Sequence, residues 1–112
     1  MIVAKRHLQG FTLLEIEGVI KLGESAKFFA DTLERSLSED TGHVLVDFSR
    51  INYIDSTGIG ELVGYLGRFR NAKRELILVQ PSERIRKLLE VAHLAELFPI
   101  YDTVEAAVAA ES

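Results

Sequence analysis

The stretch that decides the fold is VLVDFSRINYIDSTGIGELVGYLGRFRNAKRELILV, residues 44–79. It begins with VLVDF (44–48) and ends with LILV (76–79), two short runs that are apolar at nearly every position. Such runs are expected of parallel strands that are buried on both faces of a sheet. Between them, apolar residues recur every three or four positions from Ile59 to Phe69, which predicts a helix over about 56–71. Strand, helix and strand in this order indicate an α/β fold with parallel strands.

On the N-terminal side of this unit the pattern predicts a hairpin and a helix. Residues 3–8 and 11–17 read as strands, and the pair Gln9-Gly10 between them suits a tight antiparallel turn. After Gly23 the spacing of apolar residues predicts a surface helix that ends near Glu39. The residues on its apolar face are Ala26, Phe29, Ala30, Leu33 and Leu37.

On the C-terminal side the chain continues with helix signals and one short apolar segment. Pro81-Ser82 predicts the start of a third helix. LFPIY (97–101) is interrupted by proline and predicts a brief edge strand or an extended connection. Asp102 and Glu105 resemble a capping box that opens a last helix through Ala110. We therefore predict one domain over residues 1–112, with a mainly parallel sheet, an N-terminal antiparallel hairpin and about four flanking helices.

Composition and charge exclude several classes of function. The chain has 112 residues, 47% of them hydrophobic and 27% charged, which is typical of a globular domain. It contains no cysteine, so disulfides and thiolate chemistry are excluded, and a reducing cytoplasm fits. The sequence contains no run of eighteen uncharged apolar residues, so no membrane span is predicted. A net charge of -4 argues against nucleic acid as a partner and favours a protein.

The glycines of GIGELVG (58–64) raise the question of a nucleotide site. A strand followed by spaced glycines and a helix is the pattern of dinucleotide-binding turns. Here, however, Gln80-Pro81 follows the second strand where an acid should hold the ribose, and no Lys-Ser or Lys-Thr pair makes a Walker loop. Ser56 lacks the G-x-S-x-G surroundings of a hydrolase nucleophile. The three histidines, His7, His43 and His93, have no metal-site spacing. We therefore predict no cofactor, no metal and no catalytic residue.

Two features of the predicted helix 56–71 remain open from local pattern alone. Asp55-Ser56-Thr57 contains three residue types that commonly cap helices, which favours a purely structural role for this segment. Gly60, Gly64 and Gly67 line one face, where the helix either packs closely against another backbone or presents a flat surface to a partner. Basic residues at 68–74 and 84–87 are interpreted as solvated helix faces or partners of a helix C-terminus.

At this point the sequence shows a specific resemblance. VLVDFSRINYIDSTGIGELV resembles the signature of the STAS domain family, and most closely that of bacterial anti-sigma factor antagonists. Asp47-Phe48-Ser49 matches the family's Asp-x-Ser element, and residues 55–60 match Asp-Ser-Thr/Ser-Gly-x-Gly. The segment 76–108 is similar to the family's second half, so the resemblance covers nearly the whole chain. The chain departs from the commonest form in the loops 18–23 and 71–75, which leaves the identity of its partner in doubt.

The resemblance implies a protein that performs no chemistry itself and acts as a switch in transcription regulation. Ser56 matches the serine that is phosphorylated by an anti-sigma factor with serine-kinase activity, and Thr57 is the alternative acceptor. The unphosphorylated protein would bind the anti-sigma factor, the phosphorylated protein would release it, and a serine phosphatase would reset the switch. The expected partner-binding residues are Asp47, Ser49, Asp55, Ser56, Thr57, Gly58, Ile59, Gly60, Glu61 and Gly64.

A second reading of the same resemblance is a STAS interaction module in a lipid-transport or stress-signalling assembly, which docks without phosphorylation. Under the first reading, Asp47 would lie near the phosphoryl group if the two strand ends are neighbours, and it would then repel the added charge. Both readings place the protein in the cytoplasm. The sequence leaves open whether the chain is a monomer or a weak dimer.

Overall fold

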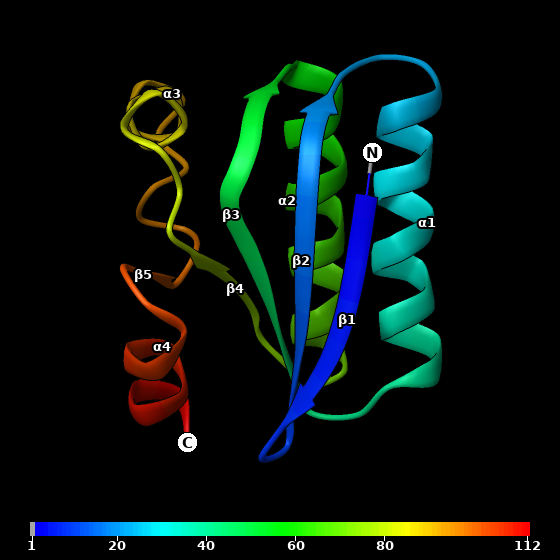
Figure 1. Cartoon of the computed structure of the whole chain (residues 1–112), viewed down its shortest axis with the longest axis vertical. Coiled ribbons are helices and arrows are strands. Elements are labelled where there is room, and N and C mark those ends of the chain that lie inside the picture. Colours follow the sequence, from blue (N-terminus) through cyan, green and yellow to red (C-terminus); the bar gives the residue numbers. More distant parts are fainter. Residues whose placement is uncertain (1) are drawn as a thin grey trace.

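The computed structural model describes residues 2–112 and shows a five-stranded mixed sheet in the strand order β1-β2-β3-β4-β5. β1 and β2 are antiparallel, and the remaining neighbours are parallel. The predicted α/β fold with an N-terminal hairpin and four helices is therefore confirmed (Figure 1). The elements are β1 (Ile2–Leu8), β2 (Phe11–Ile20), α1 (Glu24–Glu39), β3 (His43–Ile54), α2 (Ser56–Asn71), β4 (Leu76–Val79), α3 (Glu83–Val91), β5 (Ile100–Tyr101) and α4 (Val104–Glu111).

The hairpin forms at the predicted turn because that turn accepts left-handed backbone. Gln9 and Gly10 have φ angles of 43° and 87°, and the strands pair outward from Leu8 opposite Phe11. Two consecutive positive φ angles characterise the two-residue turn whose twist matches that of paired strands. Glycine at the second position adopts this conformation without steric cost.

The third strand is much longer than its apolar run predicts. The run ends at Phe48, but β3 continues to Ile54 because it keeps pairing with the long strand β2. β4 accompanies only residues 44–47 of β3. The register between β2 and β3 shifts opposite this point, between the pairs Glu15–Asp47 and Glu17–Arg50. The second half of β3 is a strand because it pairs with β2. It has no β4 neighbour, and its sequence is accordingly more polar than that of the first half.

Helices cover the two faces of the sheet unequally. In Figure 1 α2 lies behind β2 and α1 stands to its right, next to β1, and both helices contribute to the main core with one face of the sheet. α3 adds Ile85 and Leu89 to this core. α4 covers only one end of the opposite face, where Ala107 packs with a smaller apolar cluster. The rest of that face, toward the viewer in Figure 1, carries no helix.

The C-terminal helices confirm one predicted cap and correct another. Ser82 caps α3 by accepting a hydrogen bond from the Ile85 amide. For α4 the cap is Thr103, whose hydroxyl accepts from the amide of Ala106, and not Asp102 as the capping-box pattern predicts. Asp102 instead forms an exposed ion pair with Arg86 at 3.1 Å.

Candidate functional site

The segment that carries Ser56 lies at the edge of the sheet formed by the C-terminal ends of β2 and β3, where β3 ends and α2 begins (Figure 1). β2 ends at the same edge, with Ile20 opposite Ile54. The amide of Asp55 donates to the Ile20 carbonyl at 3.0 Å, so the last residue before α2 is still held to β2. The polar residues at the start of α2 therefore follow directly on backbone that is hydrogen-bonded into the sheet.

Asp55 is the N-cap of α2, and both of its carboxylate oxygens are occupied. Oδ1 accepts from the amide of Gly58 at 3.0 Å, and Oδ2 accepts from the amide of Leu22 in the β2–α1 loop at 2.8 Å. These backbone amides, Gly58 first, lower the pKa of Asp55 below its ordinary value. Asp55 therefore joins the start of α2 to the β2–α1 loop, and both oxygens of its carboxylate accept hydrogen bonds from backbone amides.

Ser56 is the first residue of α2, and its side chain is exposed. Within residues 2–112 no hydrogen bond engages the Ser56 hydroxyl, because Asp55 provides the cap. Thr57 is half-buried. Of the two predicted acceptors, Ser56 is therefore the more accessible.

Gly58 is buried, in contrast to its neighbours in the candidate set. A Cβ at this position would lie 2.6 Å from Ile20 Cγ2 and 2.7 Å from Ile54 Cγ1. α2 thus approaches the ends of β2 and β3 so closely that only glycine fits. Gly58 positions the helix and offers no side-chain surface to a partner.

The other glycines of α2 face solvent. Gly60, Gly64 and Gly67 are exposed, and a Cβ at any of them would meet no heavy atom within 4 Å. Of the two explanations left open by the sequence, close packing inside the domain is wrong. The strip is instead an exposed face of α2, flanked by the half-buried side chains of Ile59 and Glu61.

An open groove lies between α3 and the junction of β3 with α2. It has a volume of about 840 Å³, and its lining is mainly apolar. The lining residues are Tyr53, Ile54, Asp55, Ser56, Ile59, Arg84, Lys87, Leu88, Val91 and Ala92. We name it the α2–α3 groove. Sequence reasoning found Asp55, Ser56 and Ile59 but not the α3 residues, which lie about thirty positions farther along the chain.

Exposed apolar side chains mark this part of the molecule. Val91 is 73% exposed, Tyr53 is 45% exposed, and Leu22 in the loop held by Asp55 is 76% exposed. Val91 extends the apolar face of α3 beyond the core residues Ile85 and Leu89, and this sequence signal could have indicated a surface patch. Apolar surface of this kind, rimmed by polar groups, is typical of protein-interaction sites.

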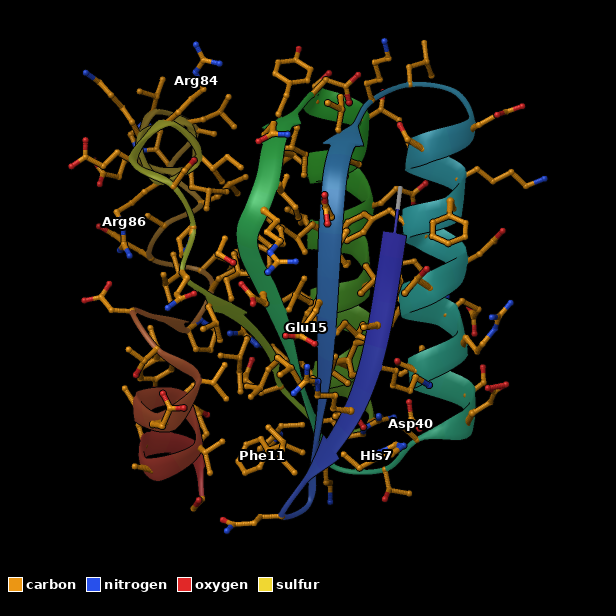
Figure 2. All side chains as sticks on the ribbon, in the orientation of Figure 1. His7, Phe11, Glu15, Asp40, Arg84 and Arg86 are labelled. Carbon is orange, nitrogen blue, oxygen red and sulfur yellow. The ribbon has the colours of Figure 1, made fainter. Side chains whose placement is uncertain are left out.

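Asp47 and Ser49 lie outside this group. They are within β3 rather than at its end, and Asp47 precedes Asp55 by eight positions of extended chain, which corresponds to roughly 25 Å. The expectation that Asp47 lies beside Ser56 is therefore wrong. Asp47 accepts a hydrogen bond from the Ser49 amide at 2.8 Å, and both residues line a polar pocket together with Glu15. Figure 2 shows Glu15 on the part of the sheet face that α4 leaves uncovered.

Metal-ligating clusters and membrane-spanning helices are both absent from the described residues. Over the described range 2–112, no three His, Cys, Asp or Glu side chains come together in a way that could hold a metal ion. None of the helices in that range has the length and apolar character that crossing a membrane requires.

Comparisons with known proteins agree with the geometry. The STAS domain family model matches residues 3–107. The anti-sigma-B factor antagonist of Staphylococcus aureus is 30% identical over 87 residues, which cover 74% of this chain and 81% of that protein. The resemblance found in the sequence is thereby confirmed.

Two solved structures show the same fold. The Thermotoga maritima protein tm1081 matches with a TM-score of 0.89 at 21% identity and covers 97% of this chain and 93% of its own. The Bacillus cell fate determinant SpoIIAA in its phosphorylated form matches with a TM-score of 0.72 at 16% identity and 96% coverage of both chains.

Proposed function

The chain belongs to the STAS domain family, and from this membership we propose that it is an anti-sigma factor antagonist controlled by phosphorylation of Ser56. In this proposal residues 1–112 form one domain that binds an anti-sigma factor with serine-kinase activity. The kinase phosphorylates Ser56 and is released, and a serine phosphatase restores the binding form. The protein is a substrate in the cytoplasm and not an enzyme.

The observation that carries the proposal is that capping and exposure fall on different residues at the start of α2. Asp55 caps the helix, which leaves the exposed hydroxyl of Ser56 without a structural task. A serine needed as a cap would resist modification, since its oxygen would be occupied by backbone amides. Ser56 is free of that constraint and also lines the α2–α3 groove.

The electrostatics of the site support a switch that leaves the fold intact. A phosphoryl group adds about 1.5 to 2 negative charges at pH 7. At the first position of α2 the helix dipole favours such a charge by about 0.3–1 kcal/mol. The ionised carboxylate of Asp55 is adjacent in sequence and opposes it. The two effects offset each other in the folded chain, so the main consequence falls on a docked partner.

A partner pressed against this edge would meet a charge that was absent when it bound. Burying a phosphate without a matching cation is strongly unfavourable, because desolvation is not repaid. The predicted contact residues Ile59, Gly60, Glu61 and Gly64 continue from Ser56 along α2, and we propose that they belong to the docked surface. Asp47 and Ser49 are omitted from it because of their distance from Ser56.

The test combines affinity capture with phosphate mapping. Immobilised wild-type protein should capture its anti-sigma partner from a lysate of the source organism, and Mg-ATP should then release it. Mass spectrometry should locate the new phosphate on Ser56. A captured kinase that labels neither Ser56 nor Thr57 would contradict the proposal.

Two substitutions at Ser56 serve as matched controls. Ser56→Ala should retain capture, since the exposed hydroxyl makes no hydrogen bond to lose, and should block release by ATP. Ser56→Asp should weaken capture by about tenfold or more, because it places a negative charge at the start of α2. Equal capture by both variants, with no phosphate incorporated, would instead indicate an interaction module that docks without phosphorylation.

A further inference from the structure

The α2–α3 groove combines apolar walls with an uncompensated positive rim. Ile59 comes from α2, and Leu88 and Val91 come from α3. Arg84 and Lys87, one helical turn apart on α3, also line the groove. Within residues 2–112 neither of them has a salt-bridge partner within 4.0 Å, although the whole chain carries a net charge of -4.

The carboxylate in this lining forms no ion pair with the two cations. Asp55 is the one carboxylate in the lining, and its two oxygens accept from the amides of Gly58 and Leu22. By contrast Arg86, on the same helix, is paired with Asp102. Figure 2 shows Arg84 and Arg86 projecting from different sides of α3, with Arg84 on the upper side, at the level where β3 passes into α2. Two cations on the groove are therefore available to a ligand.

From this arrangement we infer that the α2–α3 groove binds an amphipathic segment of the partner protein whose apolar side chains are flanked by glutamate or aspartate. The inference deepens the proposed function, on which it rests for taking the occupant to be a protein. The groove is open rather than enclosed, and its walls come from two helices, which suits the apolar face of a helix. Carboxylates beside that face would meet Arg84 and Lys87.

The same geometry gives phosphorylation a second mode of action. Ser56 and the two cations line one groove, so a phosphoryl group on Ser56 competes with the partner's carboxylates for the positive rim. The phosphate need not displace any element of the fold to do so. The partner loses its charge complement and also meets the added negative charge.

The inference is tested with synthetic probes that need no kinase. The probe is a 16-residue helical peptide with leucine at i, i+3, i+4 and i+7 and glutamate beside the leucine face. Two further peptides carry lysine or glutamine in place of glutamate. Each is titrated into the full-length 15N-labelled chain, and the amide shifts are recorded by NMR.

The glutamate peptide should shift the amides of the groove lining and bind more tightly than the other two peptides. Lys87→Glu should weaken this binding by about tenfold, since it reverses one of two rim charges. Binding should also weaken when salt is raised from 0.1 M to 1 M, because the screening length falls from about 10 Å to about 3 Å. Lys27→Glu, at an exposed site on α1, is the matched control and should leave the affinity unchanged.

A second pair of variants tests the apolar walls. Val91→Ser removes an exposed groove side chain and should weaken binding, whereas Phe28→Ser removes a similarly exposed apolar side chain from α1 and should not. Because all four substituted side chains are exposed, each variant should remain folded.

Three results would overturn the inference. They are shifts that avoid the groove or do not occur, equal affinity for the glutamate, glutamine and lysine peptides, and Arg84-dependent binding to phosphatidylglycerol vesicles without peptide binding. None of these results would affect phosphorylation of Ser56, so failure of this inference is distinguishable from failure of the proposed switch.

Discussion

Asp55, Ser56 and Gly58 stand within four positions of one another and have three different physical roles. The carboxylate of Asp55 joins two backbone segments, the hydroxyl of Ser56 points to solvent, and Gly58 allows the close approach of α2 to the sheet. The motif read from the sequence thus places the proposed phosphorylation site between two structural residues. Substitutions at the three positions should therefore give different phenotypes.

The first residue-scale prediction concerns the pH dependence of Asp55. Folding lowers its pKa, chiefly through the Gly58 amide and then the Leu22 amide, from an ordinary value of 3.8. Its contribution to stability is therefore complete above pH 3.8 and is lost as the pH falls through the lower, folded-state pKa. Asp55→Asn should lower the Tm at about pH 6, and the difference from wild type should shrink at about pH 3.

Thermal unfolding followed by circular dichroism at the two pH values measures this effect. Asp31→Asn, which changes an exposed carboxylate on α1, is the control. Its Tm should differ little from that of wild type at either pH value. A Tm deficit of Asp55→Asn that is the same at both pH values would show that the charge of Asp55 does not stabilise the fold.

The second residue-scale prediction concerns Gly58. Gly58→Ala places a methyl group against Ile20 and Ile54 at distances that force one of them to move. Overpacking of this kind typically destabilises a protein by about 1–3 kcal/mol. Urea unfolding measures the change. A variant as stable as wild type would mean that the two isoleucine side chains relax without cost.

At the scale of the element, α2 is an unusual helix because it keeps three glycines on its exposed face. Each glycine disfavours the helix, yet nothing inside the described domain lies against Gly60, Gly64 or Gly67. The core face, with Leu62, Leu66 and Phe69 buried, holds the helix in place despite this. A smooth outer face that weakens its own helix is consistent with close approach of a partner.

The prediction for α2 is a separation of stability from binding. Gly64→Ala should raise the free energy of unfolding by about 0.5–1 kcal/mol, because alanine is the better helix former and meets no atom. The same change should weaken capture of the partner described above, since the methyl group stands on the docked face. Gly67→Ala, farther from Ser56, should stabilise similarly with less effect on capture. Undiminished capture by Gly64→Ala would remove this face from the proposed interface.

A second element-scale prediction concerns the end of α1, which Arg74 closes. The Arg74 guanidinium donates to the carbonyls of Ser36, Leu37 and Gly42 at 2.6–3.1 Å, and it also stacks on the Phe69 ring. The Leu37 carbonyl belongs to the last turn of α1, where helix carbonyls lack partners within the helix; the Ser36 carbonyl also accepts from the Asp40 amide, and the Gly42 carbonyl lies in the loop before β3. Arg74→Ala should lower the free energy of unfolding by about 2–3 kcal/mol in urea titrations.

Arg35→Ala removes an exposed arginine from α1 and is the control for Arg74→Ala. Its unfolding midpoint should remain close to that of wild type. If both variants are equally stable, the three carbonyl contacts contribute nothing beyond what water provides.

At the scale of the whole molecule, the candidate site stands at one edge of the sheet and the second cluster of polar residues lies far along β3. The long strand separates Ser56 from Asp47 and Ser49, so the two ends of the family motif serve different surfaces. The core between them is continuous and fully buried at positions such as Leu14, Val46 and Phe48.

The whole-molecule prediction is that the switch leaves the scaffold unchanged. Ser56→Asp should shift amide signals near the start of α2 and along the α2–α3 groove, with little change for β1 or α4. Its Tm should stay close to that of Ser56→Ala, because the side chain is exposed and the helix dipole favours the added charge. Widespread shifts across the sheet would indicate that a change of fold, rather than a change of surface, releases the partner.

The elements whose signals are local could be predicted from the amino-acid sequence. The bounds of α2 and β4 agree with the periodicity of 56–71 and the apolar run 76–79, and the hairpin forms at Gln9-Gly10. Turn conformation and amphipathic spacing depend on near neighbours in the chain, so they can be read from it. The resemblance to the STAS family also followed from contiguous motifs.

Where these elements place their side chains depends on contacts between distant parts of the chain. β3 extends to Ile54 because β2 pairs with it, which no pattern inside SRINY reveals. Gly58 is buried and Gly60 exposed because α2 rests on Ile20 and Ile54. The α2–α3 groove unites Ser56 with Arg84 and Lys87 across about thirty positions of the chain. Long-range pairing and packing create these juxtapositions, and for that reason the accessible serine could be anticipated while the groove beside it could not.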